Sequence, residues 1–127
     1  MKLRIHGKSL RLRISRSELT RFVETGLLEE TIYFGVNASA GLTYALAWDD
    51  SSLEVGVEAA PGRVKIVLPA VDSRIWASTD RVGLGGEVDL GVRGVLSVLV
   101  EKDFACLDRN EEENADTFPN PLAAHVC

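Results

Sequence analysis

The chain has 127 residues, of which 46% are hydrophobic and 26% are charged, and its net charge is −5. This length supports one hydrophobic core, and the composition excludes a disordered or fibrous chain. No apolar run reaches the ~20 residues of a membrane-spanning helix, and the charged N-terminus lacks the apolar region of a signal peptide, so we expect one cytoplasmic domain over residues 1–127 without a role at a membrane.

Two strands and a helix are expected at the N-terminus. Apolar residues alternate with charged or polar ones in KLRIH and in SLRLRI, the pattern of half-buried strands, with a turn at Gly7 between them. Ser15 and Glu18 form a capping box that starts a helix over residues 16–25, and Gly26 ends it. ETIYFG and LTYALAW read as two further strands, so the predicted order is strand, strand, helix, strand, strand.

The second part of the chain repeats this order. LEVGVEA and RVKIVL are predicted strands, Pro69 starts a helix over AVDSRIWAS, and RVGLGGEVDL and GVLSVLVEK are strands whose glycines we expect to permit bends or bulges. When the chain is aligned with itself so that Phe22 lies on Trp76, the alternating strands also coincide, and we call this the repeat alignment. The sequence therefore predicts internal repeats at residues 1–48 and 53–100.

The stretch GKSLRLRIS followed by a capped helix resembles the N-terminal core of the AbrB/MazE-like swapped-hairpin family. Gly7, Ser9, Arg13 and Ile14 match that family's pattern, whereas Lys8 replaces its usual Asn. The family forms dimers in which each chain gives a β-β-α-β-β unit and exchanges hairpins. The resemblance therefore implies an α+β, mostly β, barrel-like pseudodimer with two short helices, in which one chain supplies both halves.

The resemblance also implies a function, because members of this family bind DNA as transcriptional regulators or antitoxins through a basic first hairpin. Such cations contact phosphates, and an arginine can also read guanine. Carried over by position, the candidate DNA-binding residues are Arg4, Lys8, Ser9, Arg11 and Arg13. We expect Arg4, Lys8, Arg11 and Arg13 to form one exposed patch without carboxylate partners. The alternative is that Arg11 and Arg13 lie against Glu54 and Glu58 or against the acidic tail, and hold the two halves together.

The last segment, residues 101–127, forms an acidic extension. It holds two basic and seven acidic residues, whereas residues 1–48 hold seven and four. The run from Asp108 to Asp116 is typical of a solvated loop, and FPNP is typical of an extended segment docked on a body. An alternative function follows from this tail, in which the domain is a repurposed scaffold that binds a basic protein partner, as the tails of the family's antitoxins do.

One group of metal-like ligands lies in the same extension. Cys106, His125 and Cys127 offer sulfur and imidazole ligands suited to zinc, with His6 or Asp108 as a fourth ligand. A disulfide between Cys106 and Cys127, or an unliganded pair of thiols, are the alternatives. The chain has no nucleophile elbow, H-E-x-x-H motif or phosphate loop, so we predict no catalytic residues and no enzymatic activity.

Overall fold

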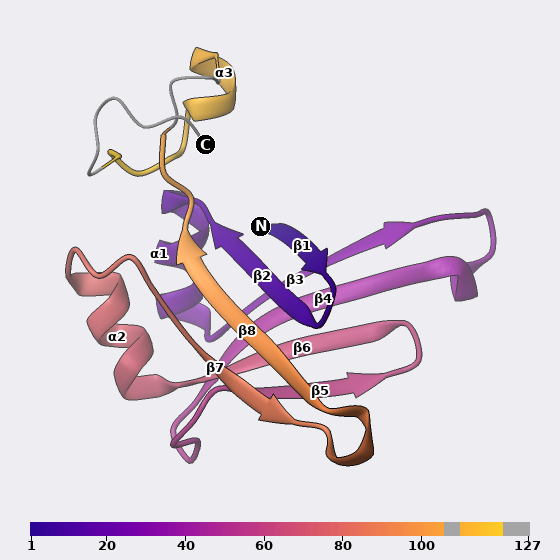
Figure 1. Cartoon of the computed structure of the whole chain (residues 1–127). Helices are drawn as coiled ribbons and strands as arrows, with labels where there is room; N and C mark the ends of the chain where they lie inside the picture. The colour runs from indigo at the N-terminus through magenta and orange to yellow at the C-terminus, as the bar shows by residue number, and fades with distance from the viewer. Residues whose placement is uncertain (106–109, 121–127) are drawn as a thin grey trace.

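The computed structural model describes residues 1–105 and 110–120 (Figure 1). Among these residues, eight strands and three short helices are joined by turns, two of them 3₁₀ turns at Ala38–Ala40 and Gly91–Arg93. In chain order, the elements are β1 (Lys2–His6), β2 (Ser9–Ile14), α1 (Arg16–Thr25), β3 (Leu27–Tyr33), β4 (Gly41–Asp49), β5 (Gly56–Ala60), β6 (Arg63–Pro69), α2 (Ala70–Ser78), β7 (Gly83–Asp89), β8 (Val95–Lys102) and α3 (Glu111–Asn114).

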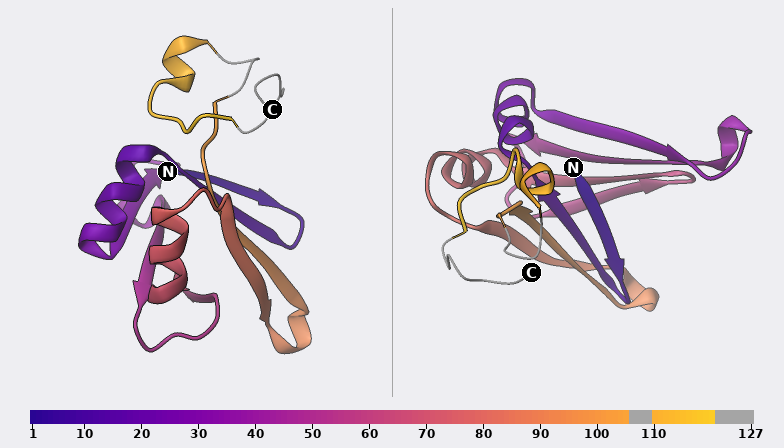
Figure 2. Two further views of the ribbon diagram at one scale, coloured as in Figure 1. Left: turned by 90° about the vertical axis from the view of Figure 1, so that its left-hand side faces the viewer. Right: turned by 90° about the horizontal axis from the view of Figure 1, so that it is seen from above.

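The strands form two four-stranded mixed sheets, which confirms the predicted α+β, mostly β class. The first sheet has the order β1-β2-β8-β7, and the second has the order β3-β4-β6-β5. The expectation of a barrel-like closed sheet is wrong for the described residues, because the two sheets remain separate. Figure 2 shows them diverging from the end of the molecule where α1 and α2 lie side by side.

The order strand, strand, helix, strand, strand occurs twice, and the strand registers follow the repeat alignment. In the β1–β2 hairpin Lys2 pairs with Arg13. In the β5–β6 hairpin the residues aligned with them, Gly56 and Val67, pair in the same way. Both hairpins are antiparallel and have a turn glycine with a positive φ, which is 54° at Gly7. This agreement supports our interpretation of the chain as two copies of one unit.

The parallel strand pairs that join the two units also follow the repeat alignment. Strands β2 and β8 are parallel and pair Ser9 with Ser97, while β6 and β4 are parallel and pair Arg63 with Thr43. Each sheet therefore takes one hairpin from residues 1–49 and one from residues 56–102. This is the arrangement that hairpin exchange between two units produces, here within one chain.

Local chemistry explains the position of α1. The Ser15 side chain accepts a hydrogen bond from the Glu18 amide and the Glu18 carboxylate accepts one from the Ser15 amide, which confirms the predicted capping box. Gly26 ends the helix with φ 77° and donates its amide hydrogen to the Phe22 carbonyl oxygen. A Cβ at Gly26 would also lie 3.1 Å from the Trp48 ring, so this close turn favours glycine.

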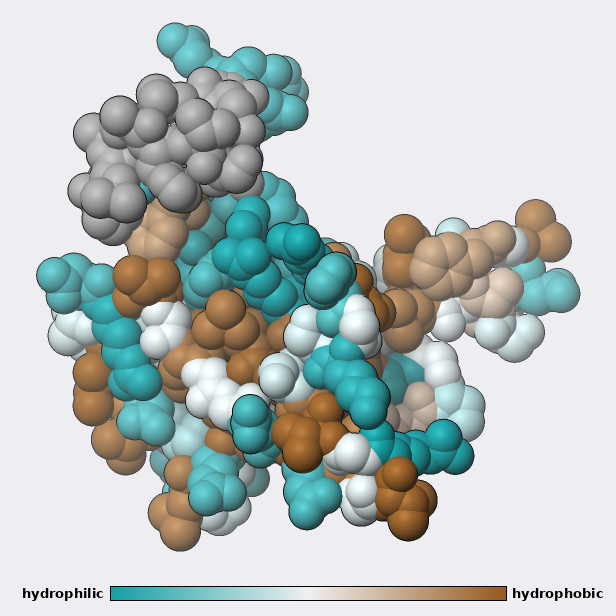
Figure 3. Space-filling model, viewed as in Figure 1, coloured by the Kyte–Doolittle hydropathy of each residue, from teal (hydrophilic) through white to brown (hydrophobic). Residues whose placement is uncertain are grey.

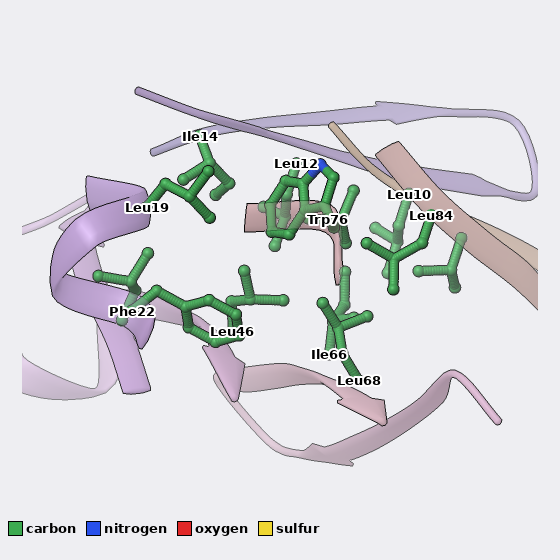
Figure 4. Close-up of a cluster of buried hydrophobic side chains, with 13 residues drawn as sticks. Leu10, Leu12, Ile14, Leu19, Phe22, Leu46, Ile66, Leu68, Trp76 and Leu84 are labelled. Carbon is green, nitrogen blue, oxygen red and sulfur yellow. The ribbon is translucent and has the colours of Figure 1, made fainter. Parts of the chain in front are cut away.

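The core lies between the two sheets and the two long helices (Figure 4). Each sheet contributes alternating apolar side chains from its inner face, and α1 and α2 close the cluster with aromatic rings. The fully buried larger side chains include Leu12, Ile14, Phe22, Leu46, Ile66, Leu68, Trp76 and Val100. Both units therefore fold around one shared core.

The β3–β4 hairpin projects from this body (Figures 1 and 3). Its tip carries exposed apolar residues, among them Phe34 and Val36, and no charged residue occurs from Thr31 to Trp48. The tip therefore lies outside the shared core.

Candidate nucleic-acid interface

The outer side of the β1–β2 hairpin carries a row of cations. Because Leu10, Leu12 and Ile14 of β2 point into the core, the residues between them point outward, and the register places alternate residues of β1 on the same side. We call this surface, together with the turn that joins the strands, the basic face. It consists of Lys2, Arg4, His6, Lys8, Ser9, Arg11 and Arg13.

Two arginines lie directly opposite one another on the basic face. Arg4 of β1 pairs with Arg11 of β2, and the next pair along is His6 with Ser9. These four residues line a small groove of about 200 Å³. The Ser9 hydroxyl donates a hydrogen bond to the His6 carbonyl oxygen (2.6 Å), which fixes one wall of the groove. No acidic residue lines this groove, and the exposed Arg4 gives it a positive charge that an anion can offset.

The expectation that all four cations are free of carboxylates is wrong for Arg11 and Arg13. Arg11 Nε donates to Glu101 Oε1 (2.6 Å), its Nη2 contacts the same oxygen, and Arg13 Nε lies 3.2 Å from it. Their side chains are 30% and 27% exposed. Glu101 is the direct register partner of Arg13 across the parallel β2–β8 junction, so one carboxylate holds both arginines against the second unit.

Of the alternative partners predicted for these arginines, Glu54 and Glu58 are wrong, whereas the acidic extension over residues 101–127 is confirmed at its first residue, Glu101. Glu58 forms its ion pair with Lys65 (2.7 Å), not with Arg11 or Arg13. The described ion pairs do not include Glu54. The internal link between the halves therefore exists, but Glu101 at the end of β8 provides it.

Arg4 and Lys8 differ from the paired arginines because both are exposed. Within the described residues, neither takes part in an ion pair. Lys8 lies in the turn beside the β7–β8 loop, where the Ser97 amide donates to the Lys8 carbonyl oxygen (2.9 Å). The Lys8 Nζ lies about 3.1 Å from the position that a Cβ would take at Gly94, so this glycine leaves room for the ammonium group.

In the second sheet, the positions equivalent to the basic face carry charges of both signs. The repeat alignment lays Glu58 on Arg4 and Lys65 on Arg11. This glutamate and lysine pair across the strands and form an ion pair. Arg63 in turn contacts Glu29 (2.8 Å). The outer side of the second sheet is therefore charge-neutralised where the first sheet keeps an excess of cations.

The acidic extension returns to α1 at one end of the basic face. The Ser17 amide donates to Asp116 Oδ1 (3.1 Å), the Ser17 hydroxyl donates to Oδ2, and the Arg16 amide donates to the Asp116 carbonyl oxygen (3.1 Å). The hydroxyl of Ser17 lowers the pKa of Asp116, and the Ser17 amide adds to this effect, although burial opposes it. Among the residues that the structure describes, Asp116 is the non-glycine residue with a positive φ, which is 70°.

Phe118 anchors this segment to the body. Its ring packs edge-on against Phe104 (6.1 Å between centroids), and its backbone bonds to Asp103 and Ala105. The ammonium group of Lys102 lies 5.3 Å from the Phe118 ring, and burial lowers the pKa of that lysine. The predicted docking of the FPNP segment therefore has a described anchor in Phe118.

Three residues of this interface were missed from the sequence. Glu101 and Asp116 were not singled out within the acidic extension, although that extension was one predicted partner of Arg11 and Arg13, and His6 was predicted only as a metal ligand. A signal for Glu101 existed in the repeat alignment, because hairpin exchange between the two copies would have placed β8 beside β2. No sequence pattern pointed to Asp116, whose role depends on where the tail folds back.

The predicted metal ligands Cys106, His125 and Cys127, and with them Asp108, lie outside the described residues. His6 is exposed on the basic face. Among residues 1–105 and 110–120, no three His, Cys, Asp or Glu side chains come together as a metal site. The zinc site stays a prediction. The helices in this part of the chain are all too short or too polar to cross a bilayer.

Residues 1–122 match the sequence profile of DUF7009, which is described as a family of unknown function. The chain belongs to this family. No curated protein and no solved structure is similar enough to match the chain. The resemblance of this DUF7009 chain to AbrB/MazE-like proteins therefore stays a prediction, carried by the residues of its first hairpin.

Proposed function

We propose that this DUF7009 chain is a non-enzymatic, cytoplasmic DNA-binding domain that contacts duplex DNA through its basic face. The observation that carries the proposal is the direct pairing of Arg4 with Arg11 across β1 and β2. Like charges opposite one another destabilise a strand pair. The equivalent pair in the second sheet, Glu58 and Lys65, is a stabilising ion pair. In the first sheet Glu101 offsets the charge of Arg11 from β8, so Arg4 is the cation of this pair that a negatively charged ligand can offset.

The geometry supports phosphate contacts. Arg13 contacts Glu101 through Nε, and none of the described hydrogen bonds uses its two Nη groups. Arg4 and Lys8 extend the row along the strand direction to the turn. A planar guanidinium group binds phosphate oxygens in a bidentate manner, and a lysine supplies a point charge. The row can therefore follow a backbone of regularly spaced phosphates.

The test is a titration of the protein with a labelled duplex at several salt concentrations, followed by anisotropy. The variant R4A/K8A removes two exposed cations that hold no described ion pair, so we expect it to fold. Its log–log salt slope should be flatter than that of the wild type by up to about two contacts, or about 1.8. Affinity should fall for all duplex sequences alike, because these contacts are to phosphates.

The matched control is R63A/K65A, which removes the same charge from the outer side of the second sheet. This control should bind DNA with nearly the wild-type salt slope. Equal losses in both variants would mean that only net charge matters and that the basic face is not the site. Failure of both the wild type and the variant E111Q/E112Q/E113Q, which neutralises the acidic segment, to bind duplex DNA at low salt would refute the proposed function.

A further inference from the structure

The acidic segment at residues 110–117 lies at one end of the basic face and faces its cations across a groove. The groove has a volume of about 420 Å³, and the body lines it with Lys2, Arg13 and Arg21 together with Glu18 and Asp103, while the segment lines it with Glu112, Glu113 and Asp116. Figure 1 shows this segment beyond the ends of β2 and β8, at the opposite end of the first sheet from the turn that holds Lys8.

The carboxylates of Glu112 and Glu113 form no ion pair with these cations among the described residues. Opposite charges that face one another across an open, polar groove still attract and lower the local positive potential. The segment is held there by Asp116, which bonds to the amide and hydroxyl of Ser17. Its position is therefore fixed by one contact at the start of α1 and by the anchor at Phe118.

The contact at Asp116 is suited to being broken. A non-glycine residue with φ 70° lies in the left-handed region, which Asp tolerates but which still costs free energy. Asp116 and Ser17 are both exposed, so water can replace each hydrogen bond when the segment leaves. Release would free the Arg16 and Ser17 amide groups of α1 and uncover Arg21, while Lys2 keeps its ion pair with Asp103 (2.7 Å) and Arg13 keeps its contact with Glu101.

We infer that residues 110–117 are an intramolecular inhibitor of the basic face, which competes with phosphates at its Arg13 end. The inference rests on the proposed function. While Asp116 holds the segment at α1, a polyanion that follows the basic face from Lys8 meets Glu112 and Glu113 after Arg13. When the segment has left, the same polyanion continues across Arg21 in the middle of α1.

The test uses the full chain with the variant E111Q/E112Q/E113Q and the same labelled duplex. The control is E24Q/D50N/E54Q, which removes equal negative charge from exposed sites outside this groove. The tail variant should bind several-fold more tightly than the control, and its salt slope should be steeper than that of the control by up to about two contacts. Equal gains in the two variants would overturn the inference and leave the proposed function standing.

A second variant, D116A, removes the contact without changing the glutamates. Amide hydrogen exchange at Ser17 should become faster than in the wild type, and DNA affinity should rise. Binding by the tail variants alone, with none by the wild type, would support both the inhibitor and the DNA-binding role. A failure of the wild type, both tail variants and the control to bind DNA would refute the proposed function and the inference together. Unchanged affinity in D116A despite faster exchange would overturn the inference.

Discussion

Phe22 and Trp76 meet edge to face in the core, with ring centroids 6.4 Å apart and an interplanar angle of 67° (Figure 4). They are also equivalent positions in the repeat alignment, at corresponding places in α1 and α2. Equivalent residues of two copies touch each other only where the copies meet at their common axis. This contact therefore supports the proposed pseudodimer and locates its axis between the two helices.

Replacing Trp76 with Phe should destabilise the fold. Trp76 is fully buried, and its Nε1 donates a hydrogen bond to the Val82 carbonyl oxygen (3.1 Å). The shorter ring leaves a cavity and loses this hydrogen bond, although the Val82 carbonyl oxygen keeps its bond from the Lys102 amide (3.0 Å), so the free energy of unfolding should fall by about 1–3 kcal/mol. Urea unfolding measures this loss. Val71→Ala on the exposed side of α2 is the control and should change the same quantity by less than about 0.5 kcal/mol. Equal effects would place Trp76 outside the core.

Glycines of β7 lie unusually close to the backbone of β8. A Cβ at Gly85 would lie 2.3 Å from the Val98 carbonyl oxygen, which no rotation of a side chain can relieve. Gly85→Ala should therefore lower the free energy of unfolding by about 1–3 kcal/mol. Gly56→Ala in β5 is the matched control, because nothing lies within 4 Å of its Cβ position. Urea unfolding of both variants measures this loss. Equal free energies of unfolding in Gly85→Ala and Gly56→Ala would contradict the close approach of β7 to β8.

The sequence predicted the features that depend on neighbouring residues. The capping box at Ser15 and the αL glycine at Gly26 need only the residues beside them, and both occur as predicted. Both long helices lie at the predicted residues, 16–25 and 70–78. The glycines of β7 were expected to permit bends or bulges, but at Gly85 the structural reason is the approach of another backbone.

Features that depend on distant segments were missed. Val71 and Ile75 lie four residues apart in α2, a spacing that favours one buried helix face, yet both are exposed, since the sheets cover the side that holds Trp76. Alternating apolar residues also could not decide whether the two sheets close into a barrel. The link from Arg13 to Glu101 joins residues 88 positions apart, and depends on the parallel pairing of β2 with β8. These outcomes are set by tertiary packing rather than by local pattern.

Tyr44 should lose its phenol proton only at an unusually high pH. Burial, together with the hydrogen bond from its hydroxyl to Glu30 Oε2 (2.7 Å) and the charge of that glutamate, raises the pKa of Tyr44 to about 12. The stability that this phenol contributes is present below pH 10 and is lost as the pH rises towards about 12. When tyrosinate is followed by its ultraviolet absorbance, the wild type should show a component that titrates near pH 12, and Tyr44→Phe should remove it. A wild-type titration that is complete by about pH 11 would contradict this assignment.

Glu18 should make the fold sensitive to acid. Its burial raises the pKa of the carboxyl group, but the hydrogen bond from the Met1 amino group, those with Ser15 and the positive charge of that amino group outweigh burial, so its pKa lies below the ordinary value of 4.5. A lowered pKa in the folded state means that the unfolded chain binds the proton more readily. The stabilisation is therefore present above about pH 4.5 and is lost as the pH falls through the pKa of the folded state.

The variant Glu18→Gln keeps the side-chain shape of the capping box but removes its charge. Its free energy of unfolding should be lower than that of the wild type at pH 7, and the difference should shrink as the pH falls from 5 to 3, because protonation removes the same charge from the wild type. Urea unfolding at several pH values measures both curves. Glu24→Gln, on the exposed side of the same helix, should run nearly parallel to the wild type. If the Glu18→Gln curve runs parallel as well, the carboxylate does not couple the start of α1 to the Met1 amino group.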